Sequence, residues 1–523
     1  MGAILPGGWP MITPNWDPAQ FDLFSVVLNA AVYGVQPFFV TEVVADFTNP
    51  TQNLLIFAQP STFASKDTLN SEDGSGVTSS YLQKVVETTQ LIPSNTSGPR
   101  PASAILNDAI DIVNLEKNIA LAGLNFGQQE DISLATNKTT LGSFQDGALK
   151  RSSLFQRFIE FHRALLAIAN VTFRIDRNTV VVPLTFDVFV GLDQIVASLE
   201  AMGDEGKRRL ANYIGWQLIN ANVPYLSRDV QELHENHLRR IRVLKEDSPP
   251  VANITESKCI GTMQSMLPLA LETLYVRKYV PADLQPKVAM LITDTKLGFA
   301  DLLREATWME NATKILALQK LDNMLNFVAF SNEVVNNKSA VNTEYSQVKI
   351  GTTFFDTVQT IMRYLVIKNL KSLDRVNVRL DPFANPVDIT QANAYNDFVQ
   401  NIIFILAGIL APPFYDPQVP QYVNYGATGG VIGHEVTHGF DTTGALFDQN
   451  QILRVWWDNA TLQAFKERSK GVIQQFNGFC TPGIGCVNGE LTVDENIADI
   501  GGLKAAYRVQ NNRLHQLEAR NVQ

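Results

Sequence analysis

Two of the chain's six histidines, His434 and His438, stand four residues apart in the segment VIGHEVTHGFD, with Glu435 between them. Four residues is just over one turn of an α-helix, so the two imidazoles would share one face. Two imidazoles placed in this way can both reach one zinc ion at about 2.0–2.1 Å, and Glu435 could reach a water on that metal. The alternative is an ordinary helix that carries two hydrogen-bonded histidines.

A catalytic zinc ion takes three protein ligands and leaves its fourth position to water. The segment LTVDENIADIGGLKAAYR, residues 491–508, offers the third ligand. Thr492 and Glu495 have the spacing of a capping box, which predicts a helix that begins there. Glu495 and Asp499 would then repel each other on one helix face unless they meet cations. We therefore expect Glu495 on the metal and Asp499 on the N–H of a ligand histidine, with a solvated acidic face as the alternative.

The other histidines do not form such a pattern. His234 and His237 are three residues apart in QELHENHLRRIRVLKED, a strongly charged segment that predicts a surface helix rather than a metal site. His162 and His515 are isolated, and we expect both to be ordinary helical residues.

Length and composition limit the class of protein. A chain of 523 residues predicts two or three domains, and an apolar share of 45% is that of a soluble globular protein. The formal charge of -10 argues against nucleic acid as the main partner. The most apolar run, residues 402–411, is shorter than the roughly 20 residues that cross a bilayer. The first residues lack the pattern of a secretory signal.

Helical periodicity dominates the first two thirds of the chain, most clearly in residues 104–123, 267–280 and 291–309. Breaker-rich joints follow Ser71, Ser94, Lys245 and Ser331, and the last predicts a domain boundary near residue 350. Beyond it, strand patterns are RVNVRL (375–380), ANAYNDF (392–398) and IIFI (402–405). Helical signal returns around His434 and after Glu495.

The cysteines and the N-glycosylation triplets indicate whether the protein is in an oxidising, extracellular compartment. Cys480 and Cys486 bracket the turn-rich TPGIG, so they form either a local disulfide or two free thiols, and Cys259 is left over. Seven N-x-S/T triplets are possible glycosylation sites, at Asn95, Asn137, Asn170, Asn253, Asn311, Asn337 and Asn459.

The segments VIGHEVTHGFD, ENIADIGGLKAAYR and NAYNDF before AGILAPPFYD resemble the neprilysin and endothelin-converting enzyme family of zinc metallopeptidases. Supporting matches are WMENATK, CIGTMQSMLPLALETLYV, LEKNIALAG and GGWP, so the resemblance covers nearly the whole chain. It implies a mainly α fold with a small β component and two lobes. Residues 1–350 would be the helical capping lobe, and residues 351–523 a thermolysin-like (gluzincin) catalytic lobe that is incomplete at its C-terminus.

The resemblance also implies roles for particular residues. His434, His438 and Glu495 match the family's ligands to one zinc ion per chain, Glu435 its catalytic glutamate, and Asp499 the acid that orients the first histidine. Asn393 and Ala394 match the pair that binds the substrate backbone. Phe414 and Val431 match positions that line an apolar pocket for the side chain after the scissile bond.

The function so implied is a zinc-dependent endopeptidase of small extracellular peptides. It would cut on the amino side of apolar residues by means of a zinc-bound water and Glu435. The resemblance implies an extracellular or cell-surface location, with membrane attachment only through an anchor that precedes this sequence. No nucleic acid partner is expected, and the oligomeric state is open.

The family pattern runs on past ENIAD and supplies a histidine, an arginine and a final Cys-x-x-Trp, which this sequence does not contain before Gln523. The alternative function is therefore a catalytically impaired, zinc-containing extracellular binding protein. Smaller departures occur at Ala392, Asn396 and Thr442, where the family usually has valine, tyrosine and aspartate.

Overall fold

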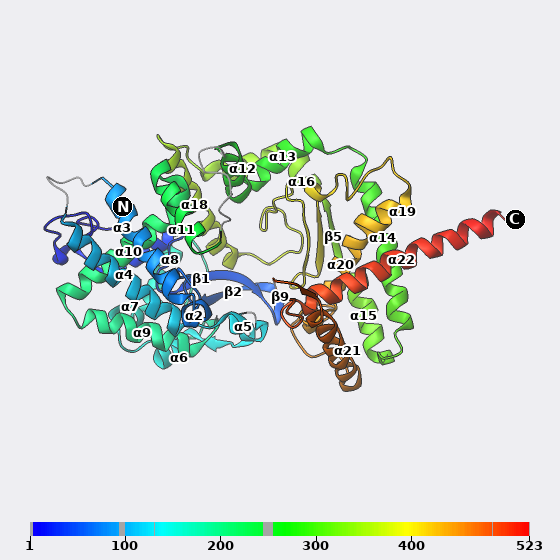
Figure 1. The fold of residues 1–523 in the computed structure, drawn as a ribbon, viewed down its shortest axis with the longest axis horizontal. Helices are drawn as coiled ribbons and strands as arrows, with labels where there is room; N and C mark the ends of the chain where they lie inside the picture. Colours follow the sequence, from blue (N-terminus) through cyan, green and yellow to red (C-terminus); the bar gives the residue numbers. More distant parts are fainter. Residues whose placement is uncertain (1–3, 94–99, 130, 244–254, 484, 522–523) are drawn as a thin grey trace. The chain divides into compact units, whose positions relative to one another are not determined.

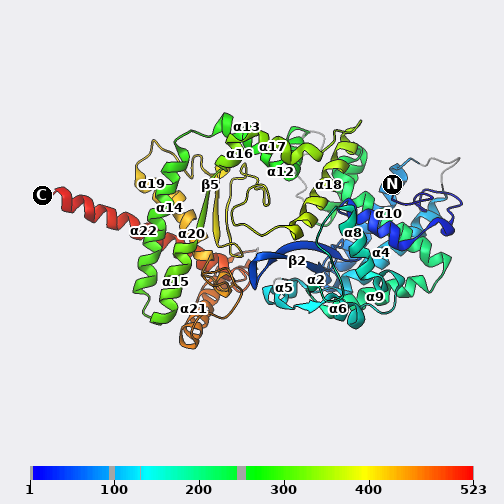
Figure 2. The same cartoon turned by 180° about the vertical axis from the view of Figure 1, so that it is seen from behind.

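The computed structural model describes residues 4–93, 100–129, 131–243, 255–483 and 485–521. Backbone contacts divide the chain into two compact units made of interleaved segments. Unit 1 comprises Met1–Val44, Gln52–Ile260 and Ser346–Val376, and unit 2 comprises Ala45–Thr51, Gly261–Tyr345 and Asn377–Gln523. The mainly helical fold class with small sheets is confirmed (Figures 1 and 2). The lobe boundary near residue 350 stays a prediction.

Unit 1 is a helical assembly around a small sheet. Its main helices are α1 (Leu23–Val32), α2 (Lys66–Asn70), α3 (Gly74–Leu91), α4 (Ala102–Ala122), α5 (Phe126–Gln129), α6 (Leu141–Ala148), α7 (Ser153–Gln156), α8 (Phe158–Ile168), α9 (Phe186–Glu200), α10 (Asp204–Asn222), α11 (Arg228–Arg240) and α18 (Phe354–Lys371). The sheet has the order β1-β2-β4-β3, from β1 (Val40–Asp46), β2 (Asn49–Ala58), β4 (Val180–Pro183) and β3 (Thr139–Thr140). Helix α12 (Thr255–Met266) runs across the division between the units.

The helix predicted at residues 104–123 is confirmed as α4, and its apolar spacing explains its place. Ile105, Ala109, Ile112 and Ile119 recur at intervals of three, four and seven, and all are buried. They belong to one core cluster that runs through unit 1. The helix packs against α3, α9 and α10, so its position follows from burial of that stripe.

Unit 2 carries the histidine and acidic motifs of the second half of the chain on helices and small sheets. Its main elements are α13 (Pro268–Tyr279), α14 (Leu284–Glu305), α15 (Asn311–Asn323), β5 (Leu325–Ala329), α16 (Asn332–Asn336), α17 (Lys338–Glu344), β6 (Ala394–Asp397), β7 (Ile402–Leu406), α19 (Gln421–Asn424), a π-helical turn η8 (Tyr425–Gly429), α20 (Gly430–His438), α21 (Asn459–Asn477), β8 (Cys480–Thr481), β9 (Gly485–Cys486) and α22 (Val493–Asn521).

The sheet of unit 2 has the order β5-β7-β6, with β7 parallel to β5 and antiparallel to β6. All five residues of β7 are buried, because this central strand is covered on both faces. Its side chains alternate between two clusters. Ile403 and Ile405 join the main core of unit 2, whereas Phe404 joins a separate cluster on the opposite face. The strands predicted in ANAYNDF and IIFI are confirmed as β6 and β7.

Two sequence predictions need correction. RVNVRL is not a strand: Asn377 donates its N–H to Thr51 O and its side-chain amide to Pro50 O, and Leu380 has φ +57°, which ends any extended run. The HENH segment is helical, in α11, but His237 is not on the surface. Its ring is buried, with Nδ1 against Ser80 Oγ of α3.

The structure also bears on the predicted glycosylation sites, on His515 and on membrane spans. The described sequon asparagines Asn137, Asn170, Asn311, Asn337 and Asn459 are all exposed, while Asn95 and Asn253 lie outside the described residues, as do most of the joints after Ser94 and Lys245. His515 lies in helix α22 as predicted. Within the described residues, none of the helices combines the length and the apolar character that a membrane span requires.

His162 in α8 is an ordinary helical residue, as predicted, and is fully buried among aromatic rings that include Phe57 and Phe158. Its Nδ1 lies 2.8 Å from Phe158 O and its Nε2 2.9 Å from Thr41 Oγ1. Burial lowers the pKa of His162 to about 4, against the opposing hydrogen bond to Phe158. The folded state therefore holds this ring neutral, with Nδ1 donating to the carbonyl.

This burial predicts acid sensitivity of the fold. Between pH 6.5 and about 4 the unfolded chain binds a proton at His162, whereas the folded chain does not. The free energy of unfolding therefore decreases as the pH falls. At pH 5 the loss from this group is on the order of 2 kcal/mol relative to neutral pH. Thermal melts of the wild type and His162→Gln at pH 7.5 and pH 5 should show a smaller acid shift in the variant. His234 and His237 remain in both proteins, so equal shifts would contradict the assignment.

Candidate metal centre

Helix α20 places the two motif histidines on one face, as the spacing predicts. The Nε2 atoms of His434 and His438 lie 2.9 Å apart, and the ring centroids are 4.5 Å apart with the rings nearly perpendicular. Both side chains are partly accessible, at 20% and 16% exposure. The pair is thus available to a ligand.

Each histidine is held from behind by a carboxylate. His434 Nδ1 lies 2.9 Å from Asp499 Oδ1, and His438 Nδ1 lies 2.6 Å from Asp441 Oδ2. A carboxylate accepts only, so each Nδ1 carries the proton and donates it. Two Nε2 lone pairs that face each other at 2.9 Å are unfavourable unless a metal ion or a shared proton lies between them. This arrangement fixes the ring orientation of a metal ligand and raises its basicity.

Glu495 completes a triangle of donor atoms. Its Oε2 lies 3.3 Å from His434 Nε2 and 3.7 Å from His438 Nε2. A tetrahedral ion with bonds of about 2.0–2.1 Å holds its ligand atoms about 3.3 Å apart. The three separations of 2.9, 3.3 and 3.7 Å lie close to that value. The donor set and its size therefore fit zinc, with a fourth position left open.

Glu435 lies beside this triangle. Its carboxylate belongs to one cluster with His434 and His438, whose ligand atoms all lie within 4.8 Å of one another. The residue is only 5% exposed. Burial raises the pKa of Glu435 to about 7, the charge of His438 opposes the rise and Glu495 adds to it. This carboxyl is suited to exchange a proton near neutral pH.

The approach of α22 to α20 brings Glu495 to the histidines, and glycines permit it. A Cβ on Gly433 would lie 2.6 Å from Gly502 O, and a Cβ on Gly502 would lie 2.4 Å from His434 N. Both are closer than real side chains come. Helix α22 also packs against α14, where a Cβ on Gly298 would lie 2.5 Å from Ala505 O. Figures 1 and 2 show α22 beside both helices.

The start of α22 is fixed to the loop after α20. Asp494 accepts hydrogen bonds from Thr442 N and Oγ1 and from Thr443 Oγ1. The helix begins beside Thr492, as predicted. The Thr492 hydroxyl, however, donates to Asn488 O and accepts from Asn496 Nδ2. The position of Glu495 thus depends on Asp494 and its threonine partners.

The same loop has a buried lysine beneath it. Lys320 of α15 is fully buried and donates to Gly444 O and Phe447 O, each at 2.7 Å. Burial lowers the pKa of Lys320 to about 7, while the charges of Asp441 and Asp448 oppose the fall. The lysine holds the loop that carries Asp441, so it positions His438 indirectly.

The edge strand β6 is tied to α20. Ala394 begins β6 and is buried, whereas Asn393 just before it is exposed. Two residues on, Asn396 Nδ2 donates to Glu435 O at 2.6 Å. The strand with the predicted backbone-binding pair is thus hydrogen-bonded to the helix of the predicted catalytic glutamate. Its outer edge faces away from β7 and is available to a further strand.

Phe414 is hydrogen-bonded to the turn that precedes the helix of Val431. Phe414 is 40% exposed, and its carbonyl accepts from Thr428 Oγ1 in the turn that leads into α20. Val431 lies in the first turn of α20 and packs against the core of unit 2. Their role as pocket residues stays a prediction.

The structure also reveals residues that the sequence analysis missed. Asp441 stands three residues after His438, and a carboxylate that closely follows a ligand histidine is a usable signal. The adjacent Gly501 and Gly502 also give a signal, since helices that cross closely need small residues. Asn396 and Lys320 give none, because their partners are distant in sequence. The local disulfide between Cys480 and Cys486 is confirmed, and Cys259 is an exposed free thiol.

Two models of one protein family match the chain. Residues 4–331 match the N-terminal model of peptidase family M13, and residues 393–523 match the second model of peptidase family M13. Together the two matches take in most of the chain.

Curated relatives are similar over nearly the whole chain. Neprilysin-11 of Caenorhabditis elegans is 27% identical over 509 residues, which cover 96% of this chain and 58% of that protein. Endothelin-converting enzyme 1 of Rattus norvegicus is 27% identical over 509 residues, which cover 97% of this chain and 63% of that protein. The chain thus spans less than two thirds of the length of these relatives.

Solved structures share the fold. PepO from Lactobacillus rhamnosis matches with a TM-score of 0.77 at 22% identity, covering 94% of this chain and 72% of that one. The zinc metalloprotease Zmp1 of Mycobacterium tuberculosis, in complex with an inhibitor, matches with a TM-score of 0.77 at 24% identity, covering 94% and 71%.

The glycine contact predicts a stability cost at one position. Gly433→Ala adds a methyl group at 2.6 Å from Gly502 O, so α20 and α22 must separate, at a cost of about 1–3 kcal/mol. Gly471→Ala is the control, because Gly471 is exposed in α21 with nothing within 4 Å of its added Cβ. It should gain about 0.5–1 kcal/mol from helix propensity. Urea unfolding measures both, and equal stabilities would contradict the close crossing.

Proposed function

Because the chain belongs to peptidase family M13, we propose that it is a zinc-dependent endopeptidase of small extracellular peptides, which it cuts on the amino side of apolar residues. The observation that carries this proposal is the triangle of His434 Nε2, His438 Nε2 and Glu495 Oε2, with a carboxylate behind each histidine. The family match supports the reaction class, and the donor set supports the metal.

His434, His438 and Glu495 would hold the zinc ion. When bound, zinc supplies a Lewis acid that lowers the pKa of water towards 7 and polarises a peptide carbonyl. Asp499 and Asp441 keep each Nδ1 protonated, so that both Nε2 atoms stay available as ligands.

Glu435 moves the proton. Its carboxyl is buried, and burial raises its pKa to about 7, so it can accept a proton from the attacking water and then deliver it to the leaving amine. The hydrogen bond from Asn396 to the Glu435 carbonyl fixes the backbone from which this side chain projects. Asn396 is thus a positioning residue.

Strand β6 would align the substrate. Its outer edge can accept an extended peptide as an additional strand, which orients the scissile bond through main-chain hydrogen bonds. The exposed side chain of Asn393 and the backbone of Ala394 lie at the start of that edge. Phe414 and Val431 would contact the apolar side chain after the cut.

An extracellular or cell-surface location is part of the proposal. The disulfide between Cys480 and Cys486 supports an oxidising compartment. The five described sequon asparagines are exposed, as glycosylation requires.

The first test is metal content. Purified protein equilibrated with zinc should retain about one ion per chain, because three protein donors converge on one point. His434→Ala removes one donor and should lose the ion after dialysis. His234→Ala is the matched control, since it removes a histidine from a helix of unit 1. Zinc content by atomic absorption decides, and equal retention by both variants would refute the assignment.

The second test is turnover. A fluorogenic peptide with leucine after the cut should be cleaved faster than one with aspartate there, and Glu435→Gln should reduce kcat by at least about 10²-fold through loss of proton transfer. Glu467→Gln is the control, because Glu467 is exposed on α21.

Equal turnover by the wild type and Glu435→Gln would exclude Glu435 as the base. Stoichiometric zinc without turnover in the wild type would instead favour a zinc-containing binding protein over the peptidase.

A further inference from the structure

Unit 2 contains a cavity that the proposed reaction does not use. Its volume is about 400 Å³, within the range of small-molecule sites. Phe327, Phe404, Leu380 and Val387 line it and belong to the cluster on one face of the sheet β5-β7-β6. The neighbouring Ile403 packs instead with the core around α20. The part of the cavity at Phe404 thus lies on the sheet face opposite Ile403, and Val328 and Phe330, which also line it, pack against the main core of unit 2.

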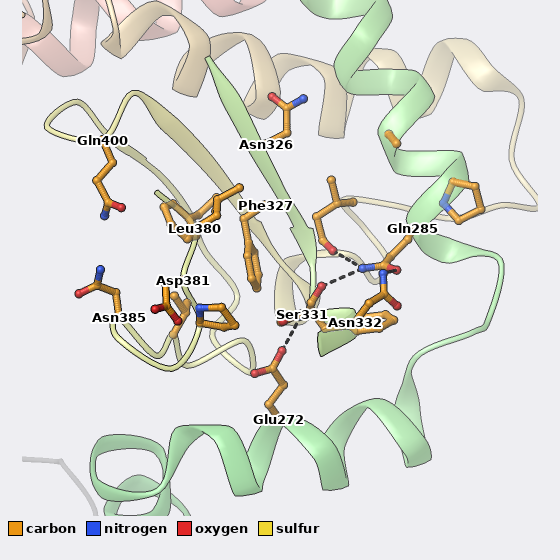
Figure 3. Close-up of a pocket in the computed structure, with 17 residues that line it drawn as sticks. Glu272, Gln285, Asn326, Phe327, Ser331, Asn332, Leu380, Asp381, Asn385 and Gln400 are labelled. Atoms are coloured by element: carbon orange, nitrogen blue, oxygen red, sulfur yellow. Dashed lines mark hydrogen bonds between the residues drawn. The ribbon is translucent and has the colours of Figure 1, made fainter. Parts of the chain in front are cut away.

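Two carboxyl groups line this cavity (Figure 3). Glu272 projects from α13 and is only 2% exposed, and its Oε1 accepts from Ser331 N at 2.6 Å. Asp381 uses Oδ1 for two backbone N–H groups, of Phe383 and Ala384. Each carboxyl thus keeps one oxygen for a ligand.

The remaining polar groups of the lining are neutral side-chain amides and a serine hydroxyl. Gln285 donates its amide N–H groups to Val328 O and Phe330 O, and its Oε1 accepts a hydrogen bond from Asn332. Gln400 Oε1 is buried without a hydrogen-bond partner among the described residues.

The lining has no lysine, arginine or histidine among the residues that the structure describes there. Burial raises the pKa of Glu272 to about 7. The hydrogen bond from Ser331 opposes the rise, and no basic side chain of the lining adds to that opposition. A buried carboxyl of this kind is costly without a cation.

The apolar floor of the cavity is aromatic. Phe327 and Phe404 are register partners on β5 and β7, with ring centroids 5.2 Å apart, and Tyr395 on β6 stacks on Phe404 at 4.6 Å. Phe330 also lines the cavity. Aromatic faces attract organic cations, and guanidinium groups also stack on them.

We propose that this cavity binds an organic cation, in which a guanidinium or ammonium group meets Glu272 and Asp381 and an apolar stem lies on Phe327 and Phe404. Such a group is found on a basic side chain of a peptide and on a free alkylamine. The proposal does not depend on the proposed peptidase function. A bare metal ion does not suit a space this large and aromatic.

Calorimetric titration of the full chain with butylguanidinium tests the proposal, with butylurea as a neutral probe of nearly the same shape. Butylguanidinium should bind saturably and at least tenfold more tightly. Glu272→Gln and Asp381→Asn should each weaken it about tenfold or more. Both amides can still accept the existing backbone N–H bonds, so both variants should fold, which thermal melts check.

Glu333→Gln is the matched control. It removes an exposed charge from α16, next to the cavity residue Asn332 but outside the lining, and should change the affinity less than twofold. His434→Ala should also leave binding unchanged. Loss of binding in His434→Ala would place the cation at the candidate metal centre and overturn the proposal. So would equal binding of butylurea, no saturable binding, or undiminished binding by Glu272→Gln.

A third probe, Nα-acetylarginine methylamide, distinguishes the two sources. Affinity equal to or above that of butylguanidinium would support binding of a peptide's basic side chain. Affinity at least tenfold lower would support a free organic cation, because the peptide backbone would then be excluded.

Discussion

The candidate metal centre depends on how closely α22 crosses α20. Glu495 is far from His434 in sequence, and its Oε2 comes within 3.3 Å of the histidine only because the two backbones touch at Gly433 and Gly502. On a neighbouring face of α22, Gly298 allows α14 to approach Ala505 of the same helix. Helix α22 is therefore held by two helices through contacts that no larger residue would permit. Packing of backbones, rather than the reach of a long side chain, sets the geometry of the third donor.

This crossing concentrates negative charge. Glu435, Asp441, Glu495 and Asp499 surround one pair of imidazoles, and like charges at such distances oppose one another. Burial raises the pKa of Glu435 to about 7, and the nearby charge of Glu495 adds to that rise. A divalent cation at the triangle would relieve the repulsion, so metal binding and the stability of this part of unit 2 should be coupled. The carboxylates behind the histidines contribute to metal binding without being ligands, since they decide which nitrogen of each ring is free.

The sequence revealed the donors because each pair obeys a helical rule. His434 and His438, and likewise Glu495 and Asp499, are four residues apart, which places each pair on one face whatever the tertiary structure. What it could not reveal depends on contacts between distant segments. Asn396 bonds to Glu435 across the strand–helix interface, and RVNVRL fails as a strand because its polar groups bond elsewhere. His237 belongs to a charged helix, yet its ring is buried against α3. A charge pattern predicts the solvent-exposed face of a helix on average, but it does not predict the burial of an individual side chain.

The alternation of β7 separates two kinds of cation site. Ile403 and Ile405 support the core behind α20, and Phe404 between them contributes to the aromatic floor of the cavity on the other face. Both environments are acidic, but their chemistry differs. Two imidazole nitrogens and a carboxylate at tetrahedral separations favour zinc, whereas the cavity offers carboxyl groups, side-chain amides and aromatic rings around a volume of about 400 Å³. Among the described residues, the cluster of histidine and acidic side chains close enough to surround one ion lies around His434, Glu435 and His438, outside the cavity lining. A cation that fills the cavity must therefore bring its own apolar surface, which is why an organic cation suits it and a metal does not.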